Sequence, residues 1–136
     1  TSTTTLRKFP CPITGETLVA VPATRPDVAI LHVSVADRSG NCMILGDDYI
    51  DPLIARAANK TFVTAEKVVD ELPTDVGNAK ASFISRIWVH GVCEMPGGAG
   101  FTSMYPDYPI NLEAAVEYQK RATDSAWLNN FIARQD

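Results

Sequence analysis

A short, almost unbroken apolar run in the first third of the chain constrains the fold more strongly than any other feature. The segment from Val28 to Val33 is apolar at every position but one and is rich in branched side chains. It is too short for a typical core helix, and its pattern is typical of a strand covered on both faces, as in a parallel sheet. We therefore expect a central strand here, followed by a turn at residues 38–41.

The rest of the chain alternates between expected strands and helices. The expected strands are residues 17–21, 60–69 and 83–94, and the expected helices are 51–59, 112–119 and 127–132. Asp51 is the expected N-cap of the first helix, with Pro52 at the first helical position, and residues 65–69 fit a strand or a helix. This order predicts an α/β fold with a mostly parallel sheet flanked by helices. Because only three or four strands are evident, we expect another chain or fragment to complete the sheet.

Composition argues against several classes of function. The 136 residues carry 12 basic and 16 acidic side chains, so the net charge of -4 leaves no basic surplus for binding nucleic acid. No apolar stretch approaches the length of a membrane span, and the polar first residues lack a signal-peptide core, so a cytoplasmic location is expected. Cys11, Cys42 and Cys93 match no zinc pattern or disulfide framework. We expect free buried thiols, with a catalytic thiol as the alternative, and no metal site.

A glycine-rich segment after the last expected strand carries the strongest functional signal. Met95-Pro-Gly-Gly-Ala-Gly-Phe-Thr-Ser103 has neither the spacing of a Walker phosphate loop nor that of a dinucleotide fingerprint. Open α/β sheets bind ligands beyond the carboxyl ends of their strands, where backbone N–H groups can bind an anion or an oxyanion. A purely structural turn is the alternative. The candidate substrate-binding residues are Gly97, Gly98, Ala99, Thr102 and Ser103.

Three further polar residues are candidates for supporting roles. His32, inside the apolar run, is expected to be a hydrogen-bonded core or interface histidine, or to support the glycine-rich loop. Glu66 is a candidate acid, base or nucleophile, and the alternative is a carboxylate paired with a nearby lysine. Asn41 closes the turn that Asp37 is expected to order, and it is a second candidate for supporting the loop or an interface.

Four segments of the chain together fit one known pattern. They are residues 14–23, 25–41, 62–69 and 92–103. The Asp-Arg-x-Gly-Asn turn that ends at Asn41 is characteristic, as is the Pro-Gly-Gly-Ala loop that leads to Tyr105-Pro-Asp-Tyr108. In order and spacing, these segments resemble the A (alpha) subunit of family I coenzyme A transferases, of the glutaconate CoA-transferase type. The resemblance extends from about Leu6 over nearly the whole chain.

The resemblance implies the CoA-transferase fold, paired A and B subunits, a coenzyme A thioester as substrate and no covalently bound cofactor. In such enzymes a glutamate attacks the acyl-CoA to form an anhydride, and then becomes a glutamyl-CoA thioester that the acceptor acid resolves. Backbone N–H groups would stabilise each oxyanion. That glutamate belongs to the B subunit, in a Glu-(Asn/Ser)-Gly segment, and no glutamate of this chain has that setting. We therefore expect no catalytic nucleophile in this chain.

The chain resembles only the carboxyl-terminal half of these A subunits, so residues 1–136 are expected to form a single partial domain. The implied partners are a B-type subunit and the missing amino-terminal half of the A subunit. Gly100-Phe101 stands where many transferases have His-Pro, which favours relatives that hydrolyse or decarboxylate acyl-CoA. Three hypotheses follow: a CoA-transferase subunit, a subunit of an acyl-CoA hydrolase or decarboxylase, and a non-catalytic structural subunit.

Overall fold

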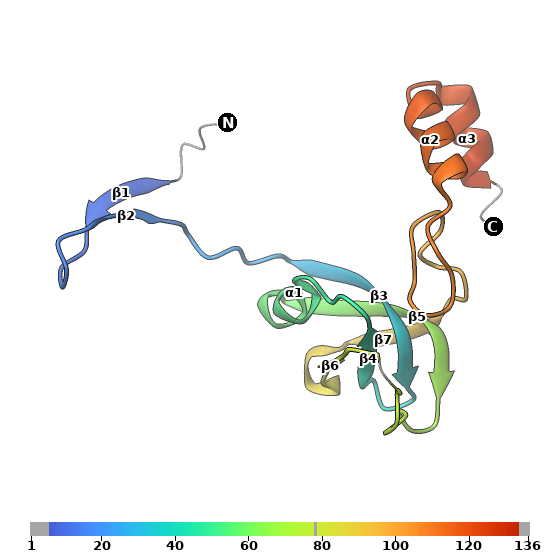
Figure 1. Ribbon diagram of the computed structural model, residues 1–136, viewed down its shortest axis with the longest axis horizontal. Coiled ribbons are helices and arrows are strands. Elements are labelled where there is room, and N and C mark those ends of the chain that lie inside the picture. Colours follow the sequence, from blue (N-terminus) through green and yellow to red (C-terminus); the bar gives the residue numbers. More distant parts are fainter. Residues whose placement is uncertain (1–5, 78, 134–136) are drawn as a thin grey trace.

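A computed structural model describes residues 6–77 and 79–133, and its centre is a five-stranded mixed sheet (Figure 1). The strands lie in the order β6-β4-β3-β5-β7. Strands β3 (Val28–Asp37), β5 (Lys60–Val69) and β7 (Gly91–Glu94) pair in parallel. Strand β4 (Cys42–Leu45) runs in the opposite direction, and it pairs antiparallel with β3 and with β6 (Ala81–Ile84), so β6 runs in the same direction as β3. The predicted α/β class is confirmed, with one antiparallel strand, β4, in the sheet.

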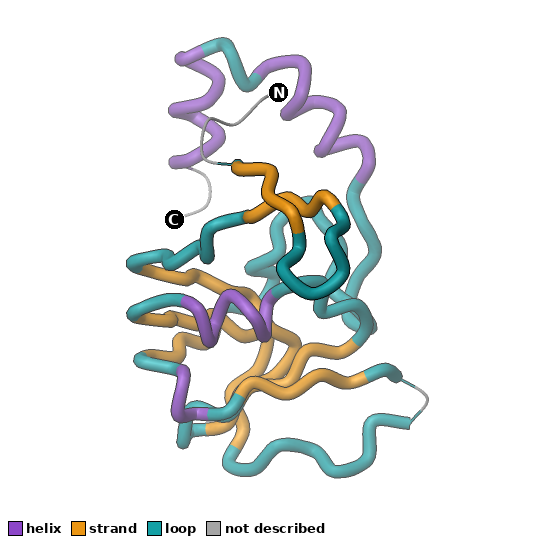
Figure 2. Tube along the Cα trace, turned by 90° about the vertical axis from the view of Figure 1, so that its left-hand side faces the viewer, coloured by secondary structure: helices purple, strands orange, loops and turns teal. Residues whose placement is uncertain are grey.

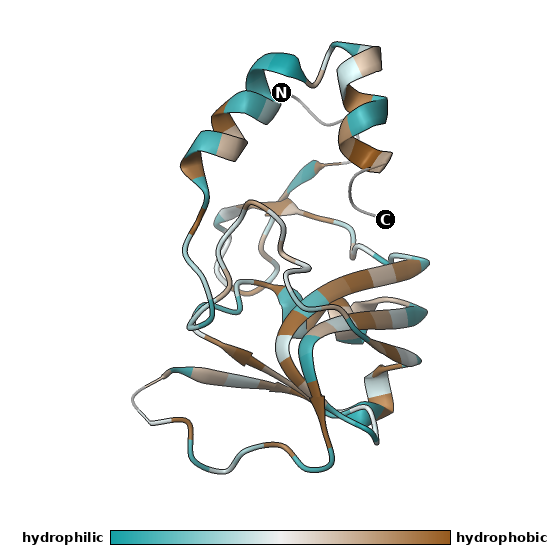
Figure 3. Ribbon diagram, turned by 90° about the vertical axis from the view of Figure 1, so that its right-hand side faces the viewer, coloured by the Kyte–Doolittle hydropathy of each residue, from teal (hydrophilic) through white to brown (hydrophobic). Residues whose placement is uncertain are grey.

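The apolar run forms the central strand, as predicted. Strand β3 pairs with β5 from Val28 opposite Lys60 to Asp37 opposite Val69, so residues 65–69 continue the strand. Side chains alternate between the two faces of a strand, and Leu31, Val33, Val63 and Ala65 are buried in the apolar core. Figure 3 shows apolar residues concentrated on the strands of this sheet. This long parallel pair is the scaffold on which the remaining elements are placed.

Helix α1 (Asp51–Ala57) packs on the sheet, with Ala55 buried in the core. The prediction that Asp51 is its N-cap is wrong by one residue. Asp51 is the first helical residue, the N-cap is Ile50, and no side chain caps this end. The Asp51 carboxylate therefore does not cap the helix, and Asp51 is one of the residues that line a cavity.

The expected strand at 83–94 is two shorter strands with a bend between them. A 3-10 turn at Arg86–Trp88 separates β6 from β7, which run in the same direction at opposite edges of the sheet. Ser85 caps this turn by accepting a hydrogen bond from the Ile87 N–H, and Asn41 Oδ1 accepts one from the Arg86 N–H at 3.1 Å. A run of apolar residues alone does not distinguish one bent segment from one straight strand.

Two hairpins project from the sheet at opposite ends of the chain (Figures 1 and 2). Strands β1 (Arg7–Pro10) and β2 (Thr17–Ala20) pair only with each other, so the expected strand at 17–21 lies outside the main sheet. Helices α2 (Leu112–Arg121) and α3 (Ser125–Ala133) form the other hairpin, and Asp124 accepts hydrogen bonds from two N–H groups at the start of α3. No helix among the described residues is long and apolar enough to cross a membrane.

The three cysteines are free, as predicted, but only Cys42 is buried. Burial, reinforced by the charge of Asp37, raises the pKa of the Cys42 thiol to about 12. Cys11 is half-buried and Cys93 is exposed. The prediction that all three thiols are buried is therefore wrong for Cys93, which lies on the edge strand β7.

The turn after β3 is ordered by Asp37, in agreement with the prediction. Asp37 Oδ1 accepts hydrogen bonds from the N–H groups of Ser39 and Asn41, and Oδ2 accepts one from Asn41 Nδ2 at 2.7 Å. Burial alone would raise the pKa of Asp37, but the hydrogen bonds from Asn41, Ser39 and Gly40 outweigh it and lower the pKa. Asp37 is therefore a structural carboxylate that also orients Asn41 toward Arg86.

Replacing this carboxylate should weaken the fold in a pH-dependent way. Because the pKa of Asp37 is lowered in the folded state, its stabilisation is present above the unfolded pKa of about 3.9 and is lost as pH falls through the folded pKa. We expect Asp37→Asn to lower the free energy of unfolding by about 1–3 kcal/mol at neutral pH and to flatten its loss in acid. Urea denaturation as a function of pH measures both effects.

The matched control is Asp70→Asn, because the Asp70 carboxylate is exposed and its pair with Arg38 is on the surface. Equal pH dependence of the Asp37→Asn variant and the unmodified protein would contradict this account of the turn.

Candidate functional site

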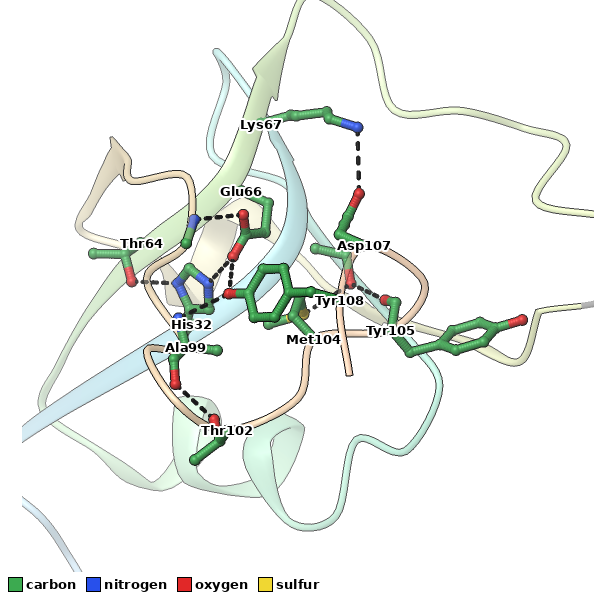
Figure 4. Close-up of polar contacts among 12 residues, drawn as sticks. His32, Thr64, Glu66, Lys67, Ala99, Thr102, Met104, Tyr105, Asp107 and Tyr108 are labelled. Atoms are coloured by element: carbon green, nitrogen blue, oxygen red, sulfur yellow. Dashed lines mark hydrogen bonds and ion pairs between the residues drawn. The ribbon is translucent and has the colours of Figure 1, made fainter. Parts of the chain in front are cut away.

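The site lies on the face of the sheet opposite the α1-side core residues. Residues His32 and Ser34 of β3, and Thr64 and Glu66 of β5, alternate with the buried apolar residues of these strands, so they point to the other face. The segment 95–108 leaves β7 and folds back over these polar side chains (Figure 4). The Met95 N–H donates to the Ala65 carbonyl at 2.7 Å, which fixes where this segment begins.

Glu66 is the centre of the polar contacts on this face. Its carboxylate is 6% exposed and accepts three hydrogen bonds from three different segments. Oε1 accepts from His32 Nε2 at 2.8 Å and from the Tyr108 hydroxyl at 2.5 Å, and Oε2 accepts from the Gly97 N–H at 2.8 Å (Figure 4). Glu66 therefore joins β3, β5, the glycine-rich turn and the Tyr108 segment.

These donors keep the carboxylate ionised. Burial alone would raise the pKa of Glu66, but the hydrogen bonds from Tyr108, Gly97 and His32 outweigh it and lower the pKa. Burial and the bond to Glu66 raise the pKa of Tyr108, so its hydroxyl stays protonated and can donate. The alternative that Glu66 pairs with a nearby lysine is wrong. Glu66 pairs with His32, and Lys67 Nζ lies 3.5 Å from Asp107 Oδ1.

His32 has both ring nitrogens engaged. Because an ionised carboxylate only accepts hydrogen bonds, Nε2 donates to Glu66, and Nδ1 lies 2.8 Å from Thr64 Oγ1. The Cβ that any larger residue would add at Gly98 would lie 2.5 Å from His32 Cε1 and 2.9 Å from the Met95 carbonyl oxygen. His32 is thus a hydrogen-bonded histidine under the loop, and only glycine fits against its ring.

The glycine-rich turn uses its own backbone N–H groups internally. The Gly97 N–H donates to Glu66, the Ala99 N–H to the Tyr108 hydroxyl at 3.1 Å, and Thr102 Oγ1 donates to the Ala99 carbonyl at 2.7 Å. Gly98, Gly100 and Thr102 donate their N–H groups to carbonyls three residues earlier. The expectation that these N–H groups are available to an anion is therefore wrong for Gly97, Gly98 and Ala99. Within the described ranges, the N–H and hydroxyl of Ser103 have no protein partner.

A cavity of about 530 Å³ lies beside the turn. Its lining includes Ala99, Thr102 and Ser103 of the turn, His32 of β3, and residues between the end of β4 and the start of α1. Met104 is buried beneath it, where Ser34 Oγ donates to its sulfur at 3.6 Å. The cavity is large enough for a small acyl group. Among the described residues that line it, Ser103, Tyr49 and Tyr105 carry hydroxyl groups without a protein hydrogen-bond partner.

The structure therefore brings most of the predicted residues together. Gly97, Gly98, Ala99, His32 and Glu66 form one network, and Thr102 and Ser103 line the cavity beside it. Asn41 is elsewhere, in the Asp37 turn, and neither bonds to this network nor lines the cavity. Tyr108 is the residue that sequence reasoning missed, although Tyr105-Pro-Asp-Tyr108 stood out as part of the family pattern. No group of three His, Cys, Asp or Glu side chains in the described part of the chain could hold a metal ion.

Comparison with known proteins gives a consistent set of relatives. Residues 10–93 match the family model described as Coenzyme A transferase. The cholesterol ring-cleaving hydrolase IpdA subunit of Mycobacterium tuberculosis is 35% identical over 128 residues, which cover 91% of this chain and 44% of that protein. The chain thus spans about half the length of this relative.

Two solved structures share the fold over almost the whole chain. Glutaconate coenzyme A-transferase from Acidaminococcus fermentans superimposes with a TM-score of 0.80 and 28% identity, over 96% of this chain and 41% of that one. The decarboxylase AibA/AibB superimposes with a TM-score of 0.73 and 30% identity, over 93% of this chain and 47% of that one. One scaffold therefore occurs in proteins named for three different reactions.

The Tyr108 hydroxyl should hold the turn in place. Tyr108→Phe removes the acceptor of the Ala99 N–H and one donor to Glu66. We expect amide hydrogen exchange at Gly97–Ala99 to become about tenfold faster, the equivalent of one lost hydrogen bond. Tyr105→Phe is the matched control, because the Tyr105 ring is 55% exposed and its hydroxyl makes no contact with described residues. Unchanged exchange in Tyr108→Phe would contradict the network.

Proposed function

The chain belongs to the coenzyme A transferase family, and we propose that it forms one wall of the acyl-CoA site of a heteromeric enzyme. The observation that carries this proposal is the cavity beside the hydrogen-bonded turn, with Ser103 in its lining; the Ser103 N–H and hydroxyl have no protein partner among the described residues. We assign the substrate's acyl group to this cavity and its thioester carbonyl to Ser103. Two donors aimed at one carbonyl oxygen would stabilise the negative charge that develops on it during acyl transfer.

The turn residues act in this proposal as the wall of the acyl site. Gly97, Gly98 and Ala99 would set the shape of that wall, and Thr102 would contribute its methyl group and an accepting oxygen. His32 and Glu66 would act through the turn, because their polar atoms bind one another, Thr64, Tyr108 and Gly97. They are positioning residues, and a substrate carbonyl would contact neither of them.

Glu66 is poorly suited to be the nucleophile. Both of its oxygens accept hydrogen bonds, its side chain is buried, and its lowered pKa marks a stabilised, weakly basic carboxylate. If the reaction is CoA transfer between carboxylic acids, the nucleophilic glutamate would then come from the partner subunit. Hydrolysis and decarboxylation of acyl-CoA are the alternative reactions, and the names of the relatives include a hydrolase and a decarboxylase.

We propose that the partners are a B-type subunit and a polypeptide equivalent to the amino-terminal half of an A subunit. Relatives of this chain are named as subunits, and AibA/AibB is a two-subunit enzyme by name. Large apolar side chains on the β1–β2 hairpin and the sheet are exposed, including Val21, Ile30 at 77% and Phe62. Their burial against other polypeptide would stabilise the assembly by about 25 cal/mol per Å² of apolar area removed from water.

The close fit at Gly98 gives a sharp test of the acyl site. Gly98→Ala adds one carbon that must displace His32 or the turn, and we expect kcat/KM of the assembled enzyme for its acyl-CoA substrate to fall about 10- to 100-fold. Gly15→Ala is the matched control, because Gly15 has positive φ but open space around it in the distant β1–β2 turn. Assembly is followed by native mass spectrometry. Full activity of an assembled Gly98→Ala enzyme would contradict the assignment.

A non-catalytic subunit is the second candidate, favoured by the absence of a Glu-(Asn/Ser)-Gly segment. Borohydride reduction of the assembled enzyme in the presence of acyl-CoA distinguishes the candidates, because it traps a glutamyl-CoA thioester on the chain that carries it. We expect the trapped residue on the partner, together with loss of turnover in Gly98→Ala. Label on this chain would contradict the assignment of the nucleophile. Trapping on the partner, with normal turnover in Gly98→Ala, would favour the non-catalytic role.

A further inference from the structure

Strands β3 and β4 separate soon after the turn that joins them. They pair only at residues 35–36 of β3 and 42–43 of β4, and β4 then continues along β6. The Leu45 N–H donates to the Ser34 hydroxyl at 3.0 Å, which takes the place of a bond between the two backbones. Residues 28–33, the first part of β3, therefore have no neighbouring strand on their β4 side within the described part of the chain.

The backbone of residues 28–33 offers hydrogen-bonding groups to this open edge. The Lys60 N–H donates to the Asp27 carbonyl at 3.1 Å, which sets the alternation of the pair between β3 and β5. In a strand, successive residues direct their N–H and carbonyl groups to opposite edges. The odd-numbered residues of this segment therefore bond to β5, and the backbone groups of Ile30 and His32 point to the open edge. No other described residue hydrogen-bonds to them there.

The cavity of about 530 Å³ lies in the fork between the two strands. Its lining includes Ile30, Leu31 and His32 of β3 and residues 44–47 at the end of β4. Leu31 and Ile44 are buried, whereas the side chain of Ile30 is 77% exposed. A strand with apolar side chains on both faces and an open edge in its first half lacks the neighbour that such a strand normally has inside a sheet.

An extended polypeptide has the chemistry that this fork requires. Its backbone carries N–H and carbonyl groups at the same spacing as the open edge, and its side chains alternate between the two faces of the sheet, next to Leu31 and next to Ile30. The matched region covers 44% of the IpdA subunit and 41% of the glutaconate coenzyme A-transferase chain. Each of these relatives therefore has further polypeptide from which such a strand could come.

We infer that a strand of the polypeptide equivalent to the amino-terminal half of an A subunit inserts between β3 and β4, with apolar side chains on both of its faces. This inference rests on the proposed function, because it names the part of that partner which reaches the acyl-CoA site. The strand occupies the part of the cavity next to β3, and its end completes the wall that begins at Ala99 and Ser103. The sheet is then completed from within, not at its outer strands β6 and β7.

Amide hydrogen exchange in the assembled enzyme, without acyl-CoA, tests the inference at single residues. Leu31 and Val33 bond to β5 and are the internal reference for a protected strand. If a strand binds the open edge, the Ile30 and His32 amides should exchange within about tenfold of this reference. Exchange of both amides at least about 100-fold faster than the reference would overturn the inference.

Two substitutions at Ile30 separate the backbone contact from the side chain. Ile30→Pro removes the N–H that points to the open edge, and Ile30→Ala keeps it. In native mass spectrometry, the amino-terminal-half polypeptide should dissociate at least about tenfold more readily from the Ile30→Pro enzyme than from the Ile30→Ala enzyme. Equal dissociation from both variants would overturn the backbone contact. If Ile30→Pro also speeds exchange at Leu31 and Val33, β3 itself is disturbed, and exchange in the unmodified enzyme decides the question.

The outcomes separate this inference from the proposed function. Protected Ile30 and His32 amides in an assembled enzyme that does not bind acyl-CoA would contradict the proposed function and leave the inserted strand standing. Rapidly exchanging amides in an enzyme that binds acyl-CoA would overturn the inserted strand and leave the acyl-CoA site standing. Protected amides in a complex made only of copies of this chain would identify the edge as a self-association surface, which also overturns the inference.

Discussion

The buried carboxylate of Glu66 is the constraint on which the arrangement of the site depends. Burying an ionised group is costly unless hydrogen bonds compensate, and here three donors from three segments do so. Each donor brings its own segment to one point: His32 from the central strand, Gly97 from the turn and Tyr108 from beyond it. These hydrogen bonds fix the backbone of the turn against the sheet. A turn held in this way can serve as the rigid wall of a binding site, because its shape does not depend on the ligand.

The same network fits the proposed division of chemical roles between this chain and a partner subunit. A carboxylate that already accepts three hydrogen bonds, with a lowered pKa, is stabilised as an anion and is a poor nucleophile. The backbone N–H groups of Gly97 and Ala99 are used to hold the turn, and Ser103 at its end keeps its donors free. On this account the chain shapes and orients, and the group that forms covalent intermediates belongs to another polypeptide. The exposed apolar side chains around the sheet fit a chain that works within an assembly.

Sequence patterns predicted the parts of this structure that depend on local and periodic signals. The apolar run at Val28–Val33 predicted the central strand, and the glycine-rich segment follows a strand of the sheet, as expected. The patterns did not predict that Glu66 and Tyr108 meet, because the two residues are 42 positions apart and only the fold brings them together. Asn41 shows the reverse case. Its motif is part of the family resemblance, yet its side chain binds Asp37 within its own turn and accepts a hydrogen bond from the Arg86 N–H, away from the candidate site. The break at Arg86–Trp88 was also missed, since its apolar residues look like those of a continuous strand.

The most direct test of this account is a crystal structure of the assembled enzyme with an unreactive ketone analogue of an acyl-CoA, in which a methylene group separates the sulfur from the carbonyl. We predict that the analogue's acyl end occupies the cavity between the glycine-rich turn and the start of α1, with its carbonyl oxygen within hydrogen-bonding distance of the Ser103 N–H or hydroxyl. The Glu66, Tyr108 and Gly97 contacts should be unchanged from those described here. An acyl group bound elsewhere, or a Glu66 carboxylate released from the turn and in contact with the analogue's carbonyl carbon, would contradict the central claim.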